Sequence, residues 1–342
     1  MSELSVREKG ILRSIVREYV TTAEPVGSRT ISKQFHLGIS PATIRNSMAD
    51  LEEKGYIQQP YTSAGRIPTD RGYRCYVDSL MEVEELTTSE TAFLEEWISS
   101  EHEGDIEAIL DQLCRSLADV SKLLGVVLTP RFEAGILQRL DLIVLNQQRV
   151  LLVLTIRSGL VKTMLLDLDR VPSSRKLSET VRVLNERLVS LSIGEIQRTI
   201  RERVETAPKG DPVLLKTLMD KADDLFRLVS PDDLHVGGTT NISMQPEFSD
   251  RRKLADFLDL LEQRERMVSL LNQNLNCKGV SITIGNENPA REMQECSLVT
   301  TTYTVGNVSG IVGVVGPTRM PYAKVAPLVS YAASLMSRVL SA

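Results

Sequence analysis

The 342-residue sequence predicts an α+β protein of several domains. Helix-capping signals recur near the N-terminus, β-prone apolar runs fill the middle and return near the end, and amphipathic helical stretches separate these groups. A hydrophobic fraction of 42% provides for a sizeable core, and the length allows two or three domains.

The first domain is predicted to open with three short helices. Ser5, followed three residues later by a glutamate, forms a capping box, and Ser28 caps a second helix after a break that contains proline and glycine. Ser40 and Pro41 start the third helix, which Gly55 ends. Two helices, a short turn and a capped third helix follow one another as in a helix-turn-helix.

The third helix has the features of a DNA recognition helix. Ile44, Met48 and Leu51 recur at the spacing of one buried face. On the opposite face, Arg45 can bond to guanine and Asn46 to adenine, while small neighbours let the backbone approach the major groove. The residues expected on this outer face are Ala42, Thr43, Arg45, Asn46 and Ala49.

Residues 56–68 predict a β-hairpin after this helix. Two short β-prone runs flank a polar tip that contains glycine, and Pro60 and Pro68 confine the hairpin to an edge. Such a hairpin is the wing of a winged helix-turn-helix domain, which we expect over residues 1–76. The arginines of the predicted site are expected to contact phosphates, except Arg45, which is expected to read base edges with Thr43 and Asn46. The predicted DNA-contacting residues are Ser28, Arg29, Ser40, Thr43, Arg45, Asn46, Tyr61, Thr62, Ser63, Arg66, Arg71 and Arg74.

Local charge favours DNA over protein as the partner of this domain. Residues 54–76 hold four basic residues and one acidic residue, whereas the whole chain carries a net charge of −5. The remainder of the chain is acidic, so DNA binding would be confined to the N-terminal domain. A helical module that binds protein is the alternative, since folds of this kind also serve that role.

A second, discontinuous domain is expected over residues 77–170 and 235–342. Helices around an antiparallel sheet indicate a GAF-like domain, an arrangement found in sensors. Gly125 is expected to end its first long helix. The expected helices span residues 105–124, 251–272 and 322–340. The expected strands span residues 136–145, 150–156, 160–168, 280–284, 298–305 and 310–315.

Residues 171–234 predict a charged, helical subdomain inserted into this sheet domain. A few helices alone bury little apolar surface, so pairing with a second copy would cover their apolar stripes. The insertion is therefore expected to form a homodimer. The alternative is that the insertion is a surface elaboration of the fold that binds no partner.

Two C-terminal motifs are candidate ligand or partner surfaces. Residues 284–288 follow a strand, where they either line a ligand pocket or form a turn in which glycine and asparagine supply positive φ. Residues 316–319 lack the spacing of a phosphate-binding loop, so Arg319 is expected either to pair internally or to mark a partner surface. The candidate residues are Asn286, Glu287, Asn288, Arg319 and Tyr322.

No catalytic residues, metal or cofactor are expected. The three histidines are scattered, and no motif of a metalloprotease, a serine hydrolase or a dinucleotide-binding fold occurs. The four cysteines form no CxxC pair, which favours free thiols in a reducing compartment. The N-terminus lacks the features of a secretion signal, and no run has the length of a membrane span. A cytoplasmic protein that is not an enzyme is predicted.

Three separated motifs resemble the HrcA family of heat-inducible transcription repressors. They are SPATIRNSMADLE at 40–52 with TSAGRIPT at 62–69 and GYR at 72–74, then IGNEN at 284–288, then GPTRMPY at 316–322. Tyr61 departs from the family pattern, which more often has histidine before TSAGR, although a tyrosine hydroxyl can still bond to a phosphate. The resemblance implies a GAF-like domain and an insertion that dimerises.

The predicted function is that of a dimeric, sequence-specific repressor that binds an inverted-repeat operator on double-stranded DNA. The resemblance implies that the operator controls chaperone genes, that heat stress releases the repressor, and that chaperonin modulates it. Two alternatives stay open: a winged-helix repressor whose GAF-like domain senses a small metabolite, and an acidic scaffold whose winged helix binds protein.

Overall fold

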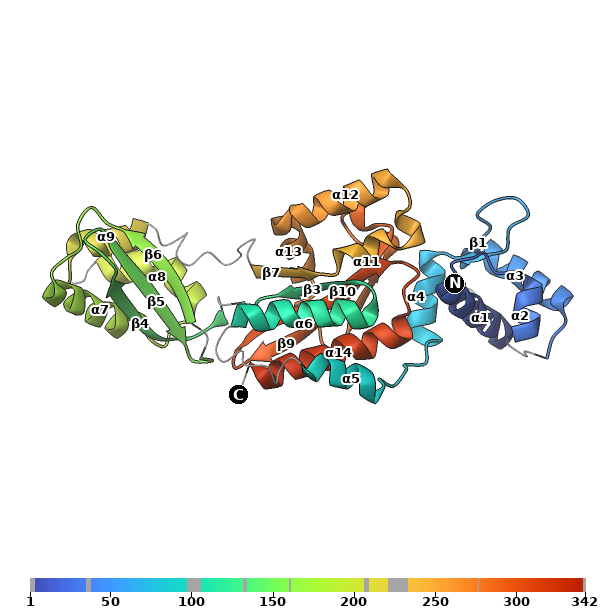
Figure 1. Ribbon diagram of the computed structural model, residues 1–342, viewed down its shortest axis with the longest axis horizontal. Coiled ribbons are helices and arrows are strands. Elements are labelled where there is room, and N and C mark those ends of the chain that lie inside the picture. Colours follow the sequence, from blue (N-terminus) through green and yellow to red (C-terminus); the bar gives the residue numbers. More distant parts are fainter. Residues whose placement is uncertain are drawn as a thin grey trace. The chain divides into compact units, whose positions relative to one another are not determined.

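The structure, a computed structural model, describes residues 4–34, 38–96, 106–131, 134–159, 161–205, 209–220, 233–275 and 277–340. The chain divides into two compact units (Figure 1). We call residues 1–128, 234–302 and 311–335 the sheet unit, and residues 129–233, 303–310 and 336–342 the insertion unit. Helices and antiparallel sheets occur in both, which confirms the mixed class. Of the three histidines, His36 and His102 lie outside the described residues.

Three helices open the sheet unit, as predicted. They are α1 (Val6–Thr22), α2 (Ser28–Gln34) and α3 (Pro41–Glu53). Ser5 and Glu8 form the capping box of α1, and the Ser40 side chain caps α3. Ser28 differs from the prediction, because it is the first helical residue of α2 rather than the residue before it. Gly55 follows the end of α3 with a φ of +75°, a conformation that glycine adopts without strain.

A short hairpin follows α3. Its strands, β1 (Ile57–Gln58) and β2 (Ile67–Pro68), pair antiparallel. Val26, before α2, forms a bridge with Arg66 through two backbone hydrogen bonds of 2.9 Å, which ties the hairpin to the helices. Helix α4 (Asp70–Ser79) begins two residues after β2 and is capped by the Thr69 side chain.

Five strands form the sheet of the sheet unit, in the order β7-β3-β10-β9-β8. Strand β3 pairs antiparallel with both β7 and β10, and β8 pairs antiparallel with β9. Gly125 was predicted to end a helix, but it lies in β3. A Cβ at Gly125 would lie 2.3 Å from the carbonyl oxygen of Cys114, so the missing side chain lets this strand approach a helix. The strands are β3 (Leu124–Leu128), β7 (Leu234–Gly237), β8 (Ser281–Ile284), β9 (Cys296–Val305) and β10 (Val308–Pro317).

Further helices surround this sheet. Helix α6 runs along β3 and also contacts β7 (Figure 1). Its Asp111 lies 2.7 Å from His235 of β7, which anchors the strand that returns from the insertion. The helix predicted at 251–272 is two helices, because the backbone leaves helical geometry at Gln263. The helices are α5 (Thr88–Glu95), α6 (Ile106–Ser121), α11 (Thr239–Ser243), α12 (Arg251–Glu262), α13 (Arg264–Asn272) and α14 (Tyr322–Val339).

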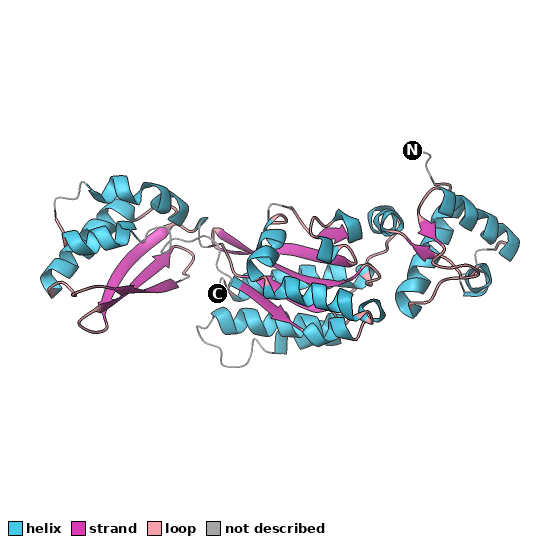
Figure 2. Cartoon of the chain, turned by 90° about the horizontal axis from the view of Figure 1, so that it is seen from above, coloured by secondary structure: helices cyan, strands magenta, loops and turns pink. Residues whose placement is uncertain are grey.

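The insertion unit contains a sheet of its own, in the order β4-β5-β6. Its strands are β4 (Leu137–Val144), β5 (Arg149–Ile156) and β6 (Val161–Asp167), and its helices are α7 (Ser174–Leu188), α8 (Ile193–Glu205) and α9 (Pro212–Asp220). The three strands were predicted to belong to the second domain, whose first segment ended at residue 170. They pair antiparallel in succession, as predicted, but as a sheet separate from the five-stranded one, and they bury Val150, Leu152 and Leu154 on the face that the helices cover. Figure 2 shows these helices gathered on one side of this sheet.

The other face of this small sheet is open, and exposed apolar side chains share it with the Arg139–Asp141 and Arg149–Asp167 ion pairs. Ile143, Leu151 and Leu165 are register partners across the three strands. Ile143 is 50% exposed and Leu165 is 55% exposed, and Val161 on the same face is 53% exposed. A helical subdomain with apolar stripes was predicted here. Among the described residues of this unit, the exposed large apolar side chains lie on the strands or next to them, except Val213 of α9.

Two other predictions concern cysteines and membrane spans. All four cysteines are free thiols, as predicted, and burial raises the pKa of Cys114 and of Cys296 to about 12. Within the described ranges, none of the helices combines the length and the apolar character needed to cross a bilayer.

Candidate nucleic-acid interface

The outer face of α3 matches its prediction from sequence. Ile44 and Leu51 are fully buried against the other helices, so the opposite face is turned to solvent. Arg45 and Asn46 are exposed, and neither side chain has a hydrogen bond or ion pair with another described residue. Thr43 is half-buried, and its hydroxyl lies 3.0 Å from that of Ser40 at the helix cap. The two long polar side chains are therefore available to a ligand.

The C-terminal end of α3 is held by a partly buried ion pair. Lys54 donates a hydrogen bond to Glu8 of α1, whose side chain is 8% exposed. Glu8 also accepts hydrogen bonds from the backbone and the hydroxyl of Ser5. The hydrogen bond from Lys54 is the main cause that lowers the pKa of Glu8 to about 2. This pair fixes the end of α3 on the first helix.

The hairpin tip presents three polar residues to solvent. Tyr61 is 66% exposed, and Thr62 and Ser63 are also exposed. The backbone shapes this tip, because Ser63 has a φ of +72°, the left-handed conformation of a tight turn. Gly65 packs so closely that a Cβ would lie 2.5 Å from the backbone carbon of Val26. The tip is thus shaped by the backbone, and its side chains are available for contacts.

Two of the predicted phosphate-binding arginines have intramolecular partners. Arg66 donates to the Glu52 carboxylate of α3 at 2.8 to 2.9 Å, with 22% of its side chain exposed. Arg71 donates to the carbonyl oxygen of Lys54 at 2.7 Å, and its guanidinium lies 4.4 Å from the ring centroid of Tyr56. Both arginines hold the hairpin and α4 against the end of α3. Arg29, in contrast, is exposed and has no side-chain partner among the described residues.

Arg74 was predicted to contact phosphates, and the structure places it elsewhere. Its guanidinium donates two hydrogen bonds to the carboxylate of Glu287 and one to the carbonyl oxygen of Ile282. A further nitrogen bonds to Asp78. Most of its donors are therefore used inside the chain, so Arg74 is removed from the predicted DNA contacts.

Residues 284–288 form a turn rather than a ligand pocket. Gly285 has a φ of +51°, and the side-chain amide of Asn288 donates to three backbone oxygens, including that of Cys296 at 3.0 Å. Asn286 bonds to Asp70 of α4. Asn288 is 5% exposed, so this buried side chain organises the turn and is not available to a partner.

The second C-terminal motif also pairs internally. Arg319 donates to Glu247 at 2.6 Å and to the carbonyl oxygen of Val20 in α1 at 2.8 Å. Internal pairing was one of the two roles predicted for Arg319. Tyr322 was a candidate surface residue, but it is 1% exposed. Its hydroxyl lies 2.6 Å from that of Ser297 and donates to the Thr318 carbonyl oxygen. Tyr322 is therefore a core residue.

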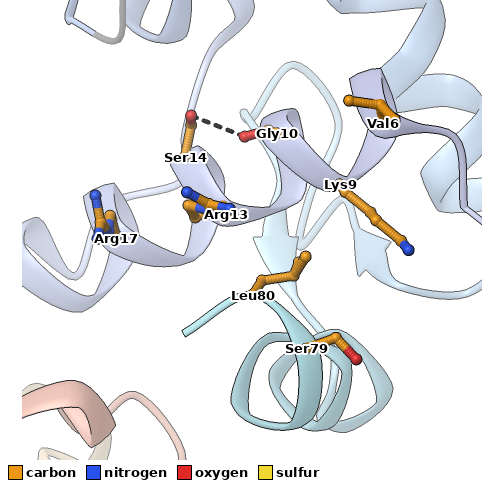
Figure 3. A pocket seen from close by; sticks show the side chains of 8 residues that line it. All are labelled: Val6, Lys9, Gly10, Arg13, Ser14, Arg17, Ser79 and Leu80. Carbon is orange, nitrogen blue, oxygen red and sulfur yellow. Dashed lines mark hydrogen bonds between the residues drawn. The ribbon is translucent and has the colours of Figure 1, made fainter. Parts of the chain in front are cut away.

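Sequence reasoning missed a basic pocket of about 450 Å³ between α1 and the end of α4 (Figure 3). Lys9, Arg13 and Arg17 recur every four residues and line it from one side of α1. The carboxylate of Glu82 accepts from Arg13 at 2.8 Å and from Arg17 at 3.0 Å, which offsets part of this charge. The spacing of the three cations was the signal in the sequence that could have revealed it.

Known proteins match the whole chain. The family model for the HrcA protein C terminal domain matches residues 107–326. The heat-inducible transcription repressor HrcA of Geobacter sulfurreducens is 42% identical over 344 residues, and that of Chlorobium phaeobacteroides (strain BS1) is 40% identical over 354 residues. Each alignment covers 99% of this chain and 99% of the relative.

A solved structure of a hypothetical protein agrees with the fold. It aligns over 99% of both chains with a TM-score of 0.64 and 21% identity. The named relatives are transcription repressors, which agrees with the prediction that this chain is not an enzyme. The chain belongs to the HrcA family of heat-inducible transcription repressors.

Proposed function

We propose that the chain binds operator DNA in a sequence-specific manner through a winged helix-turn-helix domain over residues 1–76. The observation that carries this proposal is the outer face of α3, where Arg45 and Asn46 are exposed and have no side-chain partners among the described residues. In a major groove, Arg45 would bond to a guanine and Asn46 to an adenine, with Thr43 beside them.

The phosphate contacts are assigned to groups that remain available at the edges of α3. Arg29, in α2, would contact one strand, and Tyr61, Thr62 and Ser63 at the hairpin tip would contact the backbone beside the groove. Ser40 would contribute at the start of α3, where the positive end of the helix dipole favours an anion. Arg66 and Arg71 instead bond to the end of α3 and stabilise the hairpin against it.

We propose that two copies join through the insertion unit. The open face of its sheet exposes Ile143, Val161 and Leu165, and exposed apolar side chains gathered on one face are typical of a protein interface. A second copy of the same face would cover it in a symmetric dimer. Two recognition helices would then meet two half-sites of an inverted repeat.

The family resemblance supports chaperone genes as the targets of repression. It also supports release of the repressor from DNA on heat stress and chaperonin as its modulator. The five-stranded domain is assigned as GAF-like. A metabolite-sensing repressor is the weaker alternative, because the motif expected to line a ligand site is used internally: Asn286 bonds to Asp70 and Asn288 organises its own turn.

Selection from a random pool of duplex DNA tests the proposal. The full chain should enrich one sequence with two inverted half-sites, and Arg45→Ala should abolish the enrichment of one position in each half-site. Enrichment of a single unrepeated site would reject the dimer. Failure to enrich any sequence, with the chain folded, would favour the acidic scaffold whose N-terminal domain binds protein.

A further inference from the structure

Helix α4 joins the DNA-reading segment to the five-stranded sheet. It starts two residues after β2 of the hairpin, and its residues contact the turn that follows β8. We call the four side chains of this contact the α4 latch: Asp70 and Arg74 from α4, and Asn286 and Glu287 from the turn. More than 200 residues separate the two halves of the latch in sequence, because their separations are 216 and 213 residues.

The first half of the latch is a carboxylate held by one asparagine. The Asp70 carboxylate accepts a hydrogen bond from the backbone N–H of Asn286 at 2.9 Å and one from its side-chain amide at 2.7 Å. Gly285 stands directly against this carboxylate, since a Cβ there would lie 2.4 Å from it. The turn therefore has room for Asp70 only because residue 285 lacks a side chain.

The second half of the latch is a forked ion pair. Arg74 donates from two different nitrogens to the two carboxylate oxygens of Glu287, at 2.8 and 2.5 Å. Glu287 also accepts the backbone N–H of Ile284 at 2.8 Å. Burial opposes ionisation of Glu287, but the hydrogen bonds from Arg74 and from Ile284 outweigh it and lower the pKa of the carboxyl. Such planar pairs fix orientation as well as distance.

The latch is stiffly connected to the recognition helix. Thr69, at the start of α4, donates its hydroxyl to the carbonyl oxygen of Gly55 at 2.7 Å. Arg71 of α4 donates to the carbonyl oxygen of Lys54, the cap of α3. Tyr73 of α4 packs edge-on against Tyr322 of α14, with ring centroids 6.0 Å apart. A rotation of α4 on the sheet would therefore carry α3 with it.

We propose that Asp70, Arg74, Asn286 and Glu287 are positioning residues that fix the angle of α3 relative to the five-stranded sheet. Fixing this angle narrows the range of half-site spacings that the dimer accepts. This inference rests on the proposed function, because it needs a dimer that binds two half-sites. The latch contributes no base or phosphate contact; it acts by holding one orientation before DNA arrives, which lowers the cost of binding the second half-site.

The test compares variants on DNA with one or two half-sites. The probes are the operator selected by the wild-type chain, the same operator with one or two base pairs inserted between half-sites, and a duplex with a single half-site. Arg74→Ala should bind the selected operator about tenfold more weakly, with the single half-site changed by less than about twofold. It should also lose the preference of wild type for the selected spacing over the inserted ones.

Matched variants separate positioning from a general loss of stability. Arg266→Ala removes a forked pair with Glu292 in the same unit but leaves all four latch side chains in place, and should keep the spacing preference of wild type. Glu287→Gln should behave like Arg74→Ala, and the double variant should be no worse than either single variant, because both remove one pair. Arg74→Lys keeps a charge without the fork and should restore part of the preference.

The outcomes are distinct. An unchanged spacing preference in folded Arg74→Ala and Glu287→Gln would overturn the latch inference while leaving the proposed function intact. Equal losses on the operator and on the single half-site would also overturn it, since they indicate a damaged DNA-reading segment. If wild type selects no operator, the proposed function fails, and the latch inference fails with it.

Discussion

Arg66 of the hairpin donates a hydrogen bond from Nε to a carboxylate oxygen of Glu52 on α3 at 2.9 Å, and a terminal nitrogen forms an ion pair with the same oxygen at 2.8 Å. The pair joins the predicted wing to the predicted recognition helix. An arginine that looks like a phosphate ligand in the sequence is therefore first a brace between two DNA-reading elements.

Arg66→Ala and Arg29→Ala should differ in their effects. Arg29→Ala removes a cation that has no partner among the described residues, so the slope of operator affinity against salt concentration should fall by about one. Arg66→Ala removes the brace and leaves Glu52 unpaired, which should lower the free energy of unfolding by about 1 kcal/mol and change the salt slope less. Salt titrations and urea unfolding measure both effects. A full unit loss of slope in Arg66→Ala would return this residue to the phosphate contacts.

Arg45→Ala and Asn46→Ala should each weaken operator binding by about 1 to 3 kcal/mol and relax specificity at one position in each half-site. The reason is their exposure on α3, where neither has a side-chain partner among the described residues. Binding titrations with single-base operator variants measure the effect. Ala49, on the same face, offers a control: Ala49→Ser should keep the base preference. Losses that are equal on operator and random DNA would contradict a role in base reading.

Glu8→Gln should change the acid dependence of stability. The Glu8 pKa is lowered to about 2 from 4.5, so its contribution is complete above about pH 4.5 and is lost as the pH falls towards 2. Urea unfolding should therefore show the variant about 2 kcal/mol less stable than wild type near pH 7, with the difference shrinking below pH 4.5. Glu82→Gln is the control. The Glu82 side chain is 65% exposed although it forms ion pairs, so this substitution should lower the free energy of unfolding only slightly. A difference that persists unchanged at pH 2 would reject the ionic explanation.

Leu165→Lys should weaken the dimer roughly tenfold or more, because a charge would be buried in the proposed interface on the open face of the sheet. Val213→Lys on α9 is the matched control, since Val213 is also exposed but lies on a helix of the insertion unit rather than on the open face. Sedimentation over a range of concentrations measures both. An undiminished dimer in Leu165→Lys would place the interface elsewhere.

Heating should abolish operator binding at a modest temperature, and chaperonin should speed its recovery. The sheet domain is interrupted by an insertion, so strands from distant segments must pair before stability is gained, and such topologies fold slowly and expose apolar surface. Dilution should lower the apparent midpoint if the active form is a dimer. Operator binding after refolding, with and without chaperonin, measures the effect. Complete spontaneous recovery at the same rate would reject chaperonin as modulator.

Local signals determined much of this protein. Ser5, Ser40 and Gly55 set helix boundaries through contacts with their own neighbours, and the buried stripe of α3 follows from the spacing of Ile44 and Leu51. These features involve residues a few positions apart. The outer face of α3, and with it the main part of the candidate site, is therefore predictable from the amino-acid sequence alone.

Partners far apart in the sequence were decided by the tertiary structure alone. Arg74 has the same local appearance as an arginine that binds phosphate, and only folding brings it to Glu287. The composition of strands β4 to β6 does not determine which sheet they join. In the structure they form a sheet of their own, and its buried face packs against the helices of the insertion unit. The chemistry of a charged or β-prone residue limits the kinds of partner it can bind, whereas the chain topology determines which partner comes within hydrogen-bonding distance.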